Sequence, residues 1–147
     1  MFDVGHFVAD SDIRPGRVVK LVGPFKVAEA TGTNASTDRS VVGVAVVWAA
    51  KPKGFVGDDK AALAGQEVRV YQDGEVGLAL ASTNINAGDL LVAEDSATDA
   101  RVKPIPAFNS AGTAEKSYVA VGQALHSAAA NEYVRFRVRV DIVYNKE

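Results

Sequence analysis

The stretch "EYVRFRVRVDIVY", residues 132–144, constrains the fold more than any other part of the chain. Apolar residues alternate along it with charged ones, which include Arg135, Arg137 and Arg139. A period of two is that of a β-strand, whose successive side chains point to opposite faces of a sheet. The stretch therefore predicts a long strand with one apolar and one charged face. A single such strand is not stable alone, so the chain must supply further strands beside it.

Short valine-rich runs between glycines and prolines predict these further strands. The expected strands are residues 17–22, 25–30, 41–50, 67–72, 75–81, 89–93, 101–105, 117–126 and 132–144. Helix signals are confined to "GDDKAALAG", residues 57–65, where Asp58 or Asp59 serves as the N-cap and Gly65 as the stop. Because helices are not interleaved with the strands, we expect an all-β domain and not a parallel βαβ sheet.

The segment "EVRVYQDGEVGLAL" predicts a hairpin around Asp73-Gly74. A two-residue type I′ turn needs positive φ at both central positions, which Asp-Gly adopts at little cost. In that register Val70 faces Gly77 and Val68 faces Ala79.

The two halves of the chain share a pattern whose parts keep the same order. The matched segments are "IRPGRVVKL" (13–21) with "INAGDLLVA" (85–93), "VGVAV" (42–46) with "VGQAL" (121–125), and "EVRVY" (67–71) with "YVRFR" (133–137). Two copies of one β unit explain these matches, and chance similarity of short apolar segments is the alternative. In the first interpretation Gly16 and Gly88 occupy the same turn ahead of a strand.

The length of 147 residues suits one domain. We expect an N-terminal arm over residues 1–14, either frayed or bound to a neighbouring chain, and a single β domain over 15–147. The formal net charge of −2 provides no basic field for nucleic acid or an anionic membrane. The chain has no cysteine, which excludes disulfides and thiolate chemistry. With no signal-peptide pattern and no membrane-spanning run, we expect synthesis in the cytoplasm.

The sequence shows no constellation typical of catalysis. His6 and His126 lie outside any metal-ligand spacing, and there is no GxSxG nucleophile turn or phosphate-binding glycine loop. We therefore expect a protein that is not an enzyme and that holds no metal or cofactor.

Acidic residues in "NAGDLLVAEDSA", residues 86–97, raise the question of a metal site. The alternative is a tight turn that leads into a strand. Arg17 fills, in the first half, the position that Asp89 fills in the second, so Asp89 cannot be a ligand common to both halves. We favour the turn, with Glu94 and Asp95 as turn or solvent-exposed residues.

Two groups of residues are candidates for binding a partner. Arg135, Arg137 and Arg139 form a solvated strand face, cross-strand pairs with acids on neighbouring strands, or a docking face for an acidic partner. Phe2, Val4 and Phe7 are apolar anchors in the N-terminal arm. A nucleic-acid partner is disfavoured, because the arginine face lacks interleaved aromatic residues.

The order "AGDLL", "VAVGQAL" and "EYVRFRV", preceded by "VVGVAV" and "AGQEVRVYQDGEVGLAL", resembles the bacteriophage capsid decoration (cement) protein family over roughly residues 13–140. The resemblance implies a compact β-barrel or β-tulip-like fold. It also implies a virion protein on the capsid exterior, often a homotrimer, which binds the major capsid protein and stabilises the head. The arm and the loop over residues 50–65 lie outside the family pattern. The alternative function is a small β-barrel receptor- or glycan-binding module of a phage tail or fibre, for which Trp48 would have to form an exposed platform.

Overall fold

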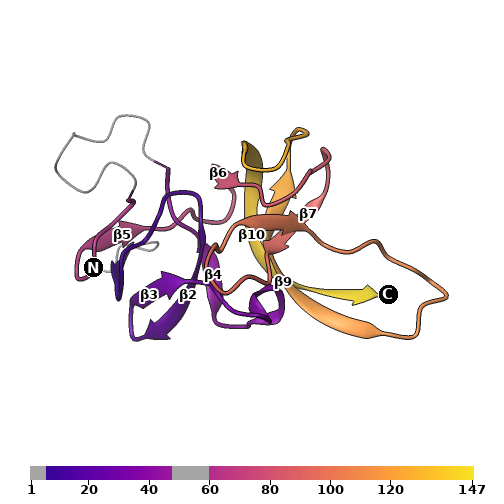
Figure 1. Ribbon diagram of the computed structural model, residues 1–147, viewed down its shortest axis with the longest axis horizontal. Coiled ribbons are helices and arrows are strands. Elements are labelled where there is room, and N and C mark those ends of the chain that lie inside the picture. The colour runs from indigo at the N-terminus through magenta and orange to yellow at the C-terminus, as the bar shows by residue number, and fades with distance from the viewer. Residues whose placement is uncertain (1–5, 48–59) are drawn as a thin grey trace.

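The computed structural model describes residues 6–47 and 60–147 (Figure 1). Over these residues the chain forms ten β-strands and one short 3₁₀ helix. In chain order they are β1 (His6–Ala9), β2 (Val18–Gly23), β3 (Lys26–Glu29), η1 (Ala35–Thr37), β4 (Val41–Val44), β5 (Glu67–Arg69), β6 (Val76–Leu80), β7 (Leu90–Ala93), β8 (Val102–Pro104), β9 (Glu115–Ala124) and β10 (Tyr133–Lys146). The expectation of an all-β fold is confirmed. Within the described residues, no helix is long and apolar enough to cross a membrane.

The strands form two five-stranded sheets, with the orders β4-β2-β3-β1-β5 and β6-β10-β9-β7-β8. An isolated bridge between Ala45 and Val70 joins the ends of β4 and β5, the edge strands of the first sheet. A parallel bridge between Ala81 and Val102 likewise joins the edges of the second sheet. Each sheet therefore curls back on itself. We call them the N-terminal and C-terminal barrels; the barrel-like architecture expected from the sequence is confirmed.

All nine strands expected from the sequence are found, with boundaries shifted by a few residues. β10 has the alternation that the sequence predicts: Val134, Phe136 and Val138 are buried, and the arginines between them are exposed. A bulge between Val138 and Asp141 interrupts its pairing with β9. The bulge inserts one extra residue on β10 and bends the long strand. Before the bulge β10 pairs with both β6 and β9, and after it β10 pairs with β9.

β1 comes from the segment expected to form a separate arm, and its place differs from that expectation. It lies inside the N-terminal barrel, parallel to β3 and antiparallel to β5. Further along, Ile13 is fully buried and bridges to Ala62. The described part of residues 1–14 is therefore built into the barrel, where its backbone groups find hydrogen-bond partners and Ala9 and Ile13 are buried, while Val8 stays exposed.

The two barrels repeat the same pairing scheme, which confirms the internal repeat. Equivalent pairs are Phe7–Val68 and Ala79–Val134, Val19–Gly43 and Leu91–Gly122, Leu21–Val27 and Ala93–Val102, and Ile13–Ala62 and Ile85–Ala128. The irregularity between β2 and β4 at Val19/Lys20 recurs between β7 and β9 at Leu91/Val92. Chance similarity between short apolar segments does not produce the same bulge at the same place in both sheets. The matches in sequence therefore come from two copies of one β unit.

The glycine turn recurs as well. Gly16 and Gly88 have φ of 71° and 91°, in the left-handed region that favours glycine. The Gly16 N–H donates to the Ala45 carbonyl at 3.0 Å, and the Gly88 N–H donates to the equivalent Ala124 carbonyl at 2.8 Å. Both glycines thus close the same turn ahead of a strand, as the sequence predicts.

The predicted hairpin around Asp73-Gly74 is wrong. The turn exists, but β5 before it pairs with β1 and β6 after it pairs with β10, in the other barrel. Tyr71 explains the departure: its ring lies over Gly77, where an added Cβ would come within 2.8 Å of it, and packs edge-on against Phe136 at 6.2 Å. The chain crosses between barrels here because these contacts offset the loss of the local pairing.

Each barrel has its own core, and the cores consist of equivalent residues. Ile13, Ala45 and Val68 lie in the N-terminal core. Their equivalents Ile85, Ala124 and Val134 lie in the C-terminal core. The expected helix over residues 57–65 is not found from Lys60 onward, and its first residues lie outside the described part of the chain.

The barrels are packed against each other through one face of the N-terminal barrel. Val18, Val41 and Val44 point outward from β2 and β4, yet all three belong to the core of the C-terminal barrel. They meet the extended ribbon of β9 and β10, which reaches past its own barrel (Figure 1). This shared core makes the two repeats one unit.

Candidate functional site

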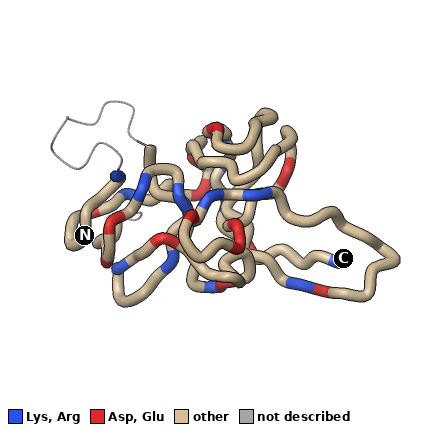
Figure 2. The backbone as a smooth tube through the Cα atoms, in the orientation of Figure 1, with Lys and Arg blue, Asp and Glu red and all other residues tan. Residues whose placement is uncertain are grey.

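Basic and acidic residues are interspersed along the backbone of the two barrels (Figure 2). Among the described residues, no three His, Asp or Glu side chains are grouped so as to hold a metal ion. The charged groups divide into those that have ion-pair or hydrogen-bond partners within the fold and those that do not, and the second kind are the candidates for binding.

The acidic residues of the stretch 86–97 serve the fold. The Asp89 carboxylate accepts a hydrogen bond from the Asn86 N–H at 2.9 Å and closes the turn, so the turn interpretation is confirmed. Asp95 accepts from the Ser36 N–H at 2.9 Å and from Lys103 at 3.0 Å. Burial alone would raise the pKa of Asp95, but these hydrogen bonds outweigh burial and hold the pKa below its ordinary value.

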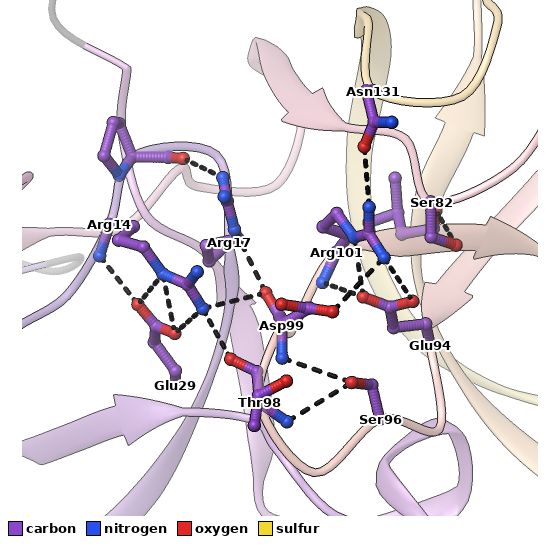
Figure 3. A network of polar contacts seen from close by, with 12 residues as sticks. Arg14, Arg17, Glu29, Ser82, Glu94, Ser96, Thr98, Asp99, Arg101 and Asn131 are labelled. Atoms are coloured by element: carbon purple, nitrogen blue, oxygen red, sulfur yellow. Dashed lines mark hydrogen bonds and ion pairs between the residues drawn. The ribbon is translucent and has the colours of Figure 1, made fainter. Parts of the chain in front are cut away.

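A polar network joins the N-terminal barrel to the loop between β7 and β8 (Figure 3). The Glu29 carboxylate accepts from the Arg14 guanidinium at 2.7 Å and from the Arg14 backbone N–H at 2.8 Å. Arg14 also donates to the carbonyl of Thr98 at 2.6 Å, and Arg17 donates to that of Asp99 at 3.0 Å. Burial, followed by the charge of Arg14, lowers the pKa of Arg17.

The same network continues within the C-terminal barrel (Figure 3). Arg101 donates to Glu94 at 2.8 Å and to Asn131 at 2.6 Å, and it lies 3.3 Å from Asp99. The hydrogen bond to Glu94 is the main reason that the pKa of Arg101 is raised. Every acid in the network has a basic partner inside the fold, so the network is structural support and leaves none of its own acids to act on a ligand.

The outward side of the C-terminal barrel is different in character. Strand pairing sets Val76, Arg137, Gln123 and Leu90 side by side in one row across β6, β10, β9 and β7. Arg135 lies next to this row, opposite Leu78, and Arg139 follows on β10. We call this surface the arginine face: Val76, Leu90, Gln123, Arg135, Arg137 and Arg139.

A hollow of about 360 Å³ is set into the arginine face. Arg137, Arg139 and Asp141 line it from β10, and Leu90, Ala120 and Gln123 line it from β7 and β9. The Gln123 amide donates to the Gly88 carbonyl at 3.1 Å, so the repeated glycine turn supports one wall. The lining of the hollow combines apolar residues such as Leu90 and Ala120 with two arginines and one aspartate.

The charges of the arginine face are largely unpaired within the described residues. Arg139 lies 3.7 Å from Asp141, and both side chains are exposed, so this pair contributes little. In the same part of the chain, Arg135 and Arg137 have no acidic side chain at ion-pair distance. The sequence left three interpretations open for the arginines, and for Arg135 and Arg137 the one that fails is cross-strand ion pairing with described residues. The exposed face itself agrees with either a solvated surface or a docking surface.

The two histidines lie far apart in the chain and have different surroundings. His6 begins β1 and contacts Glu67 on β5. His126 lies just after β9, and its Nε2 accepts a hydrogen bond from the backbone N–H of Arg135 at 3.0 Å. His126 thus holds the main chain at the start of the arginine face.

Of the three candidate anchors in the N-terminal segment, the structure describes only Phe7. Phe2 and Val4 lie outside the described residues, as does Trp48. Phe7 lies in β1, is half-buried and packs against the N-terminal core. With Tyr71 and Val140 it lines a second hollow, of about 430 Å³, between the barrels. Phe7 is therefore a packing residue of the fold.

Sequence reasoning missed the neighbours of the arginines, Val76, Leu90 and Gln123. Their place follows from strand order, which joins β6 to β10 and β9 to β7. The internal repeat carried part of this information, because it indicates that β9 and β7 pair as β4 and β2 do. The pairing of β6 with β10 has no comparable local signal, since the hairpin pattern predicts a different partner for β6.

Comparisons with known proteins support the fold. No protein-family model and no curated protein matches the chain. Among solved structures, the chain is similar to the head fiber gp8.5 N base of bacteriophage phi29, with a TM-score of 0.51 and 15% sequence identity. The similarity covers 91% of this chain and 91% of that one. At this identity the likeness shows a common fold, and it spans both barrels.

Proposed function

We propose that this chain is a structural protein of a phage virion that binds the outer surface of the capsid as a decoration protein and stabilises the head. The observation that carries the proposal is the fold shared, over nearly all of both chains, with the base of a phage head fiber. The exposed arginine face, with apolar side chains between its charges, supports a binding role. The proposal includes that the chain is not an enzyme.

The physical mechanism is linkage. A protein that binds the assembled shell better than its dissociated subunits shifts the equilibrium toward the shell. Many copies on one head multiply this effect through avidity. We propose that the partner is the major capsid protein and that the chain acts as a homo-oligomer, a trimer in the favoured form. Exposed aromatic residues such as Phe108 and Tyr144, at 68% and 75%, are available as apolar anchors.

Co-sedimentation tests this function. The purified chain is mixed at low micromolar concentration with mature, empty heads of the phage that encodes it. We expect saturable binding to the heads and an increase in the temperature at which the heads disrupt. A chain that stays in the supernatant while the heads remain intact contradicts the proposal. Multi-angle light scattering of the free chain tests the trimer independently.

A further inference from the structure

Because the two barrels are copies of one unit, the exposure of equivalent residues in them can be compared. Val18 and Val44 of the N-terminal barrel are equivalent to Leu90 and Gln123 of the C-terminal barrel, because the pairs Val18–Val44 and Leu90–Gln123 have the same register. Val18 and Val44 are fully buried, at 0% exposure. Leu90 is half-buried and Gln123 is exposed. The same face of the repeat is therefore covered in one copy and open in the other.

The cover of the N-terminal face is a segment of protein. The buried Val18 and Val44 share a core with Val119, Val121 and Val138 of the β9–β10 ribbon. This face of the repeat is thus shaped to receive extended chain. No described segment takes the corresponding place on the C-terminal barrel, where the equivalent surface is the hollow of about 360 Å³.

The chemistry of the open face differs from that of the covered one. Arg137 and Arg139 line the hollow, and Arg135 lies beside it. Arginine presents a planar fork of donors that matches a carboxylate at two points. Because Arg135 and Arg137 have no acidic partner among the described residues, the charge that complements this face is negative.

A carboxylate-bearing protein fits this surface better than nucleic acid does. Val76 and Leu125 are 58% and 43% exposed around the arginines and offer apolar contacts that a phosphate backbone does not use. The chain as a whole carries a net charge of −2, without the basic excess that drives phosphate binding.

We propose that the arginine face binds an extended acidic segment of another protein, with carboxylates at Arg135 and Arg137 and apolar side chains in the hollow. On the function proposed above, on which this assignment of a partner rests, the segment belongs to a capsid subunit. The charges set its register, and the apolar residues of the hollow contribute the burial.

The test compares two charge-reversed variants of the full chain. R135E/R137E changes the arginine face. The matched control is K26E/R39E, which reverses two exposed cations on the N-terminal barrel. A labelled peptide of glutamates and valines serves as the probe in fluorescence anisotropy. We expect R135E/R137E to weaken peptide binding by about tenfold or more. We expect K26E/R39E to change it by less than about twofold.

The outcomes separate this proposal from the proposed function. If both variants bind the peptide equally well, the arginine face is not its binding site and the proposal is wrong. Tighter binding of an oligothymidylate than of the peptide also contradicts the proposal. If the wild type self-associates and R135E/R137E does not, the arginine face binds a second copy of the chain. That result also contradicts the proposal. The milder R135Q/R137Q variant repeats the test if the reversed one melts early. In the co-sedimentation assay, equal binding of wild type and R135E/R137E to the heads contradicts only the assignment of the arginine face. If the heads bind neither protein, the proposed capsid-binding function is wrong.

Discussion

Removing the Glu29 carboxylate tests how much the Arg14–Glu29 pair of the polar network contributes to the stability of the fold. The Glu29 side chain is 12% exposed and its partner Arg14 is 30% exposed. Breaking a fully buried ion pair costs about 3–5 kcal/mol. Arg14 retains access to water and keeps its hydrogen bonds to the carbonyls of Thr98 and Asp99. We therefore expect E29A to lower the free energy of unfolding by about 2 kcal/mol. This value lies between the cost of breaking an exposed ion pair and that of breaking a buried one.

Urea denaturation followed by circular dichroism measures this change. For a chain of this length, about 2 kcal/mol corresponds to a fall of about 4–8 °C in melting temperature. The dependence on denaturant should keep its slope, because the surface exposed on unfolding is unchanged. The control is D141N, which removes a charge from the Arg139–Asp141 pair, where the side chains are 77% and 56% exposed. It should shift stability by less than about 0.5 kcal/mol. Equal effects of E29A and D141N would refute the structural role of the network.

Two further expectations concern the repeated turn and the C-terminal ribbon. G88A should cost about 1–2 kcal/mol for left-handed backbone alone, because no atom lies within 4 Å of the added Cβ. G16A should cost more, because its Cβ would come within 2.8 Å of the Tyr133 ring, and thermal melts of both variants check the order. Burial and the hydrogen bond to Glu147 raise the pKa of Tyr118 to about 12, so its contribution to stability is complete below pH 10 and lost as pH rises through about 12. Absorbance titration should show a late phenol transition that Y118F lacks; loss of all tyrosine protons near pH 10 would contradict it.

The strands were largely predictable from the sequence because their signals are local. β10 alternates with a period of two from Tyr133 to Arg139, ahead of its bulge, and glycine turns with positive φ mark the starts of β2 and β7. β1 was not predictable in this way. Three of its four residues pair with β5, some sixty positions along the chain, and their ordering depends on Phe7 reaching a core built by later residues.

The failed hairpin shows where local reasoning ends. Asp73-Gly74 forms a turn with Gly74 at φ of 91°, but Asp73 lacks the positive φ that the predicted type I′ turn requires. The strands on either side nevertheless separate, since the Asp73 carboxylate accepts from the Val140 N–H at 3.0 Å beside the β10 bulge. A turn motif reports the path of the chain over four residues. The choice of sheet is made by packing that the motif does not contain.

The arginine face was predictable in part, for a related reason. Its cations stand on one strand and share one face by periodicity alone. That Leu90 and Gln123 complete the surface depends on which strands flank β10, and only the repeat pointed to the pairing of β7 with β9.

The two copies of the barrel agree at inward positions and differ where their surroundings differ. The residue type is the same in both copies at three inward positions: Ile13 and Ile85, Ala45 and Ala124, and Val68 and Val134. These positions are constrained by the same small core in each barrel, where a change of one methylene is felt.

Outward positions on the shared face are not constrained in this way. Val44 is replaced by Gln123. Arg69, which pairs with Glu75 at 3.2 Å, is matched by Arg135, which has no acidic partner among the described residues. One copy therefore uses its outward face to hold the chain together, and the other presents a charged face to whatever lies outside.

Because the fold needs only one of the two faces covered, binding can be confined to the C-terminal barrel without loss of stability. The Q123V variant, which restores the valine of the covered copy, should thus fold as well as the wild type. Its binding of the acidic peptide should weaken only through the changed wall of the hollow. Comparing Q123V with R135E/R137E in the same anisotropy assay separates the contribution of shape from that of charge. A larger loss for Q123V would show that the arginines do not dominate recognition.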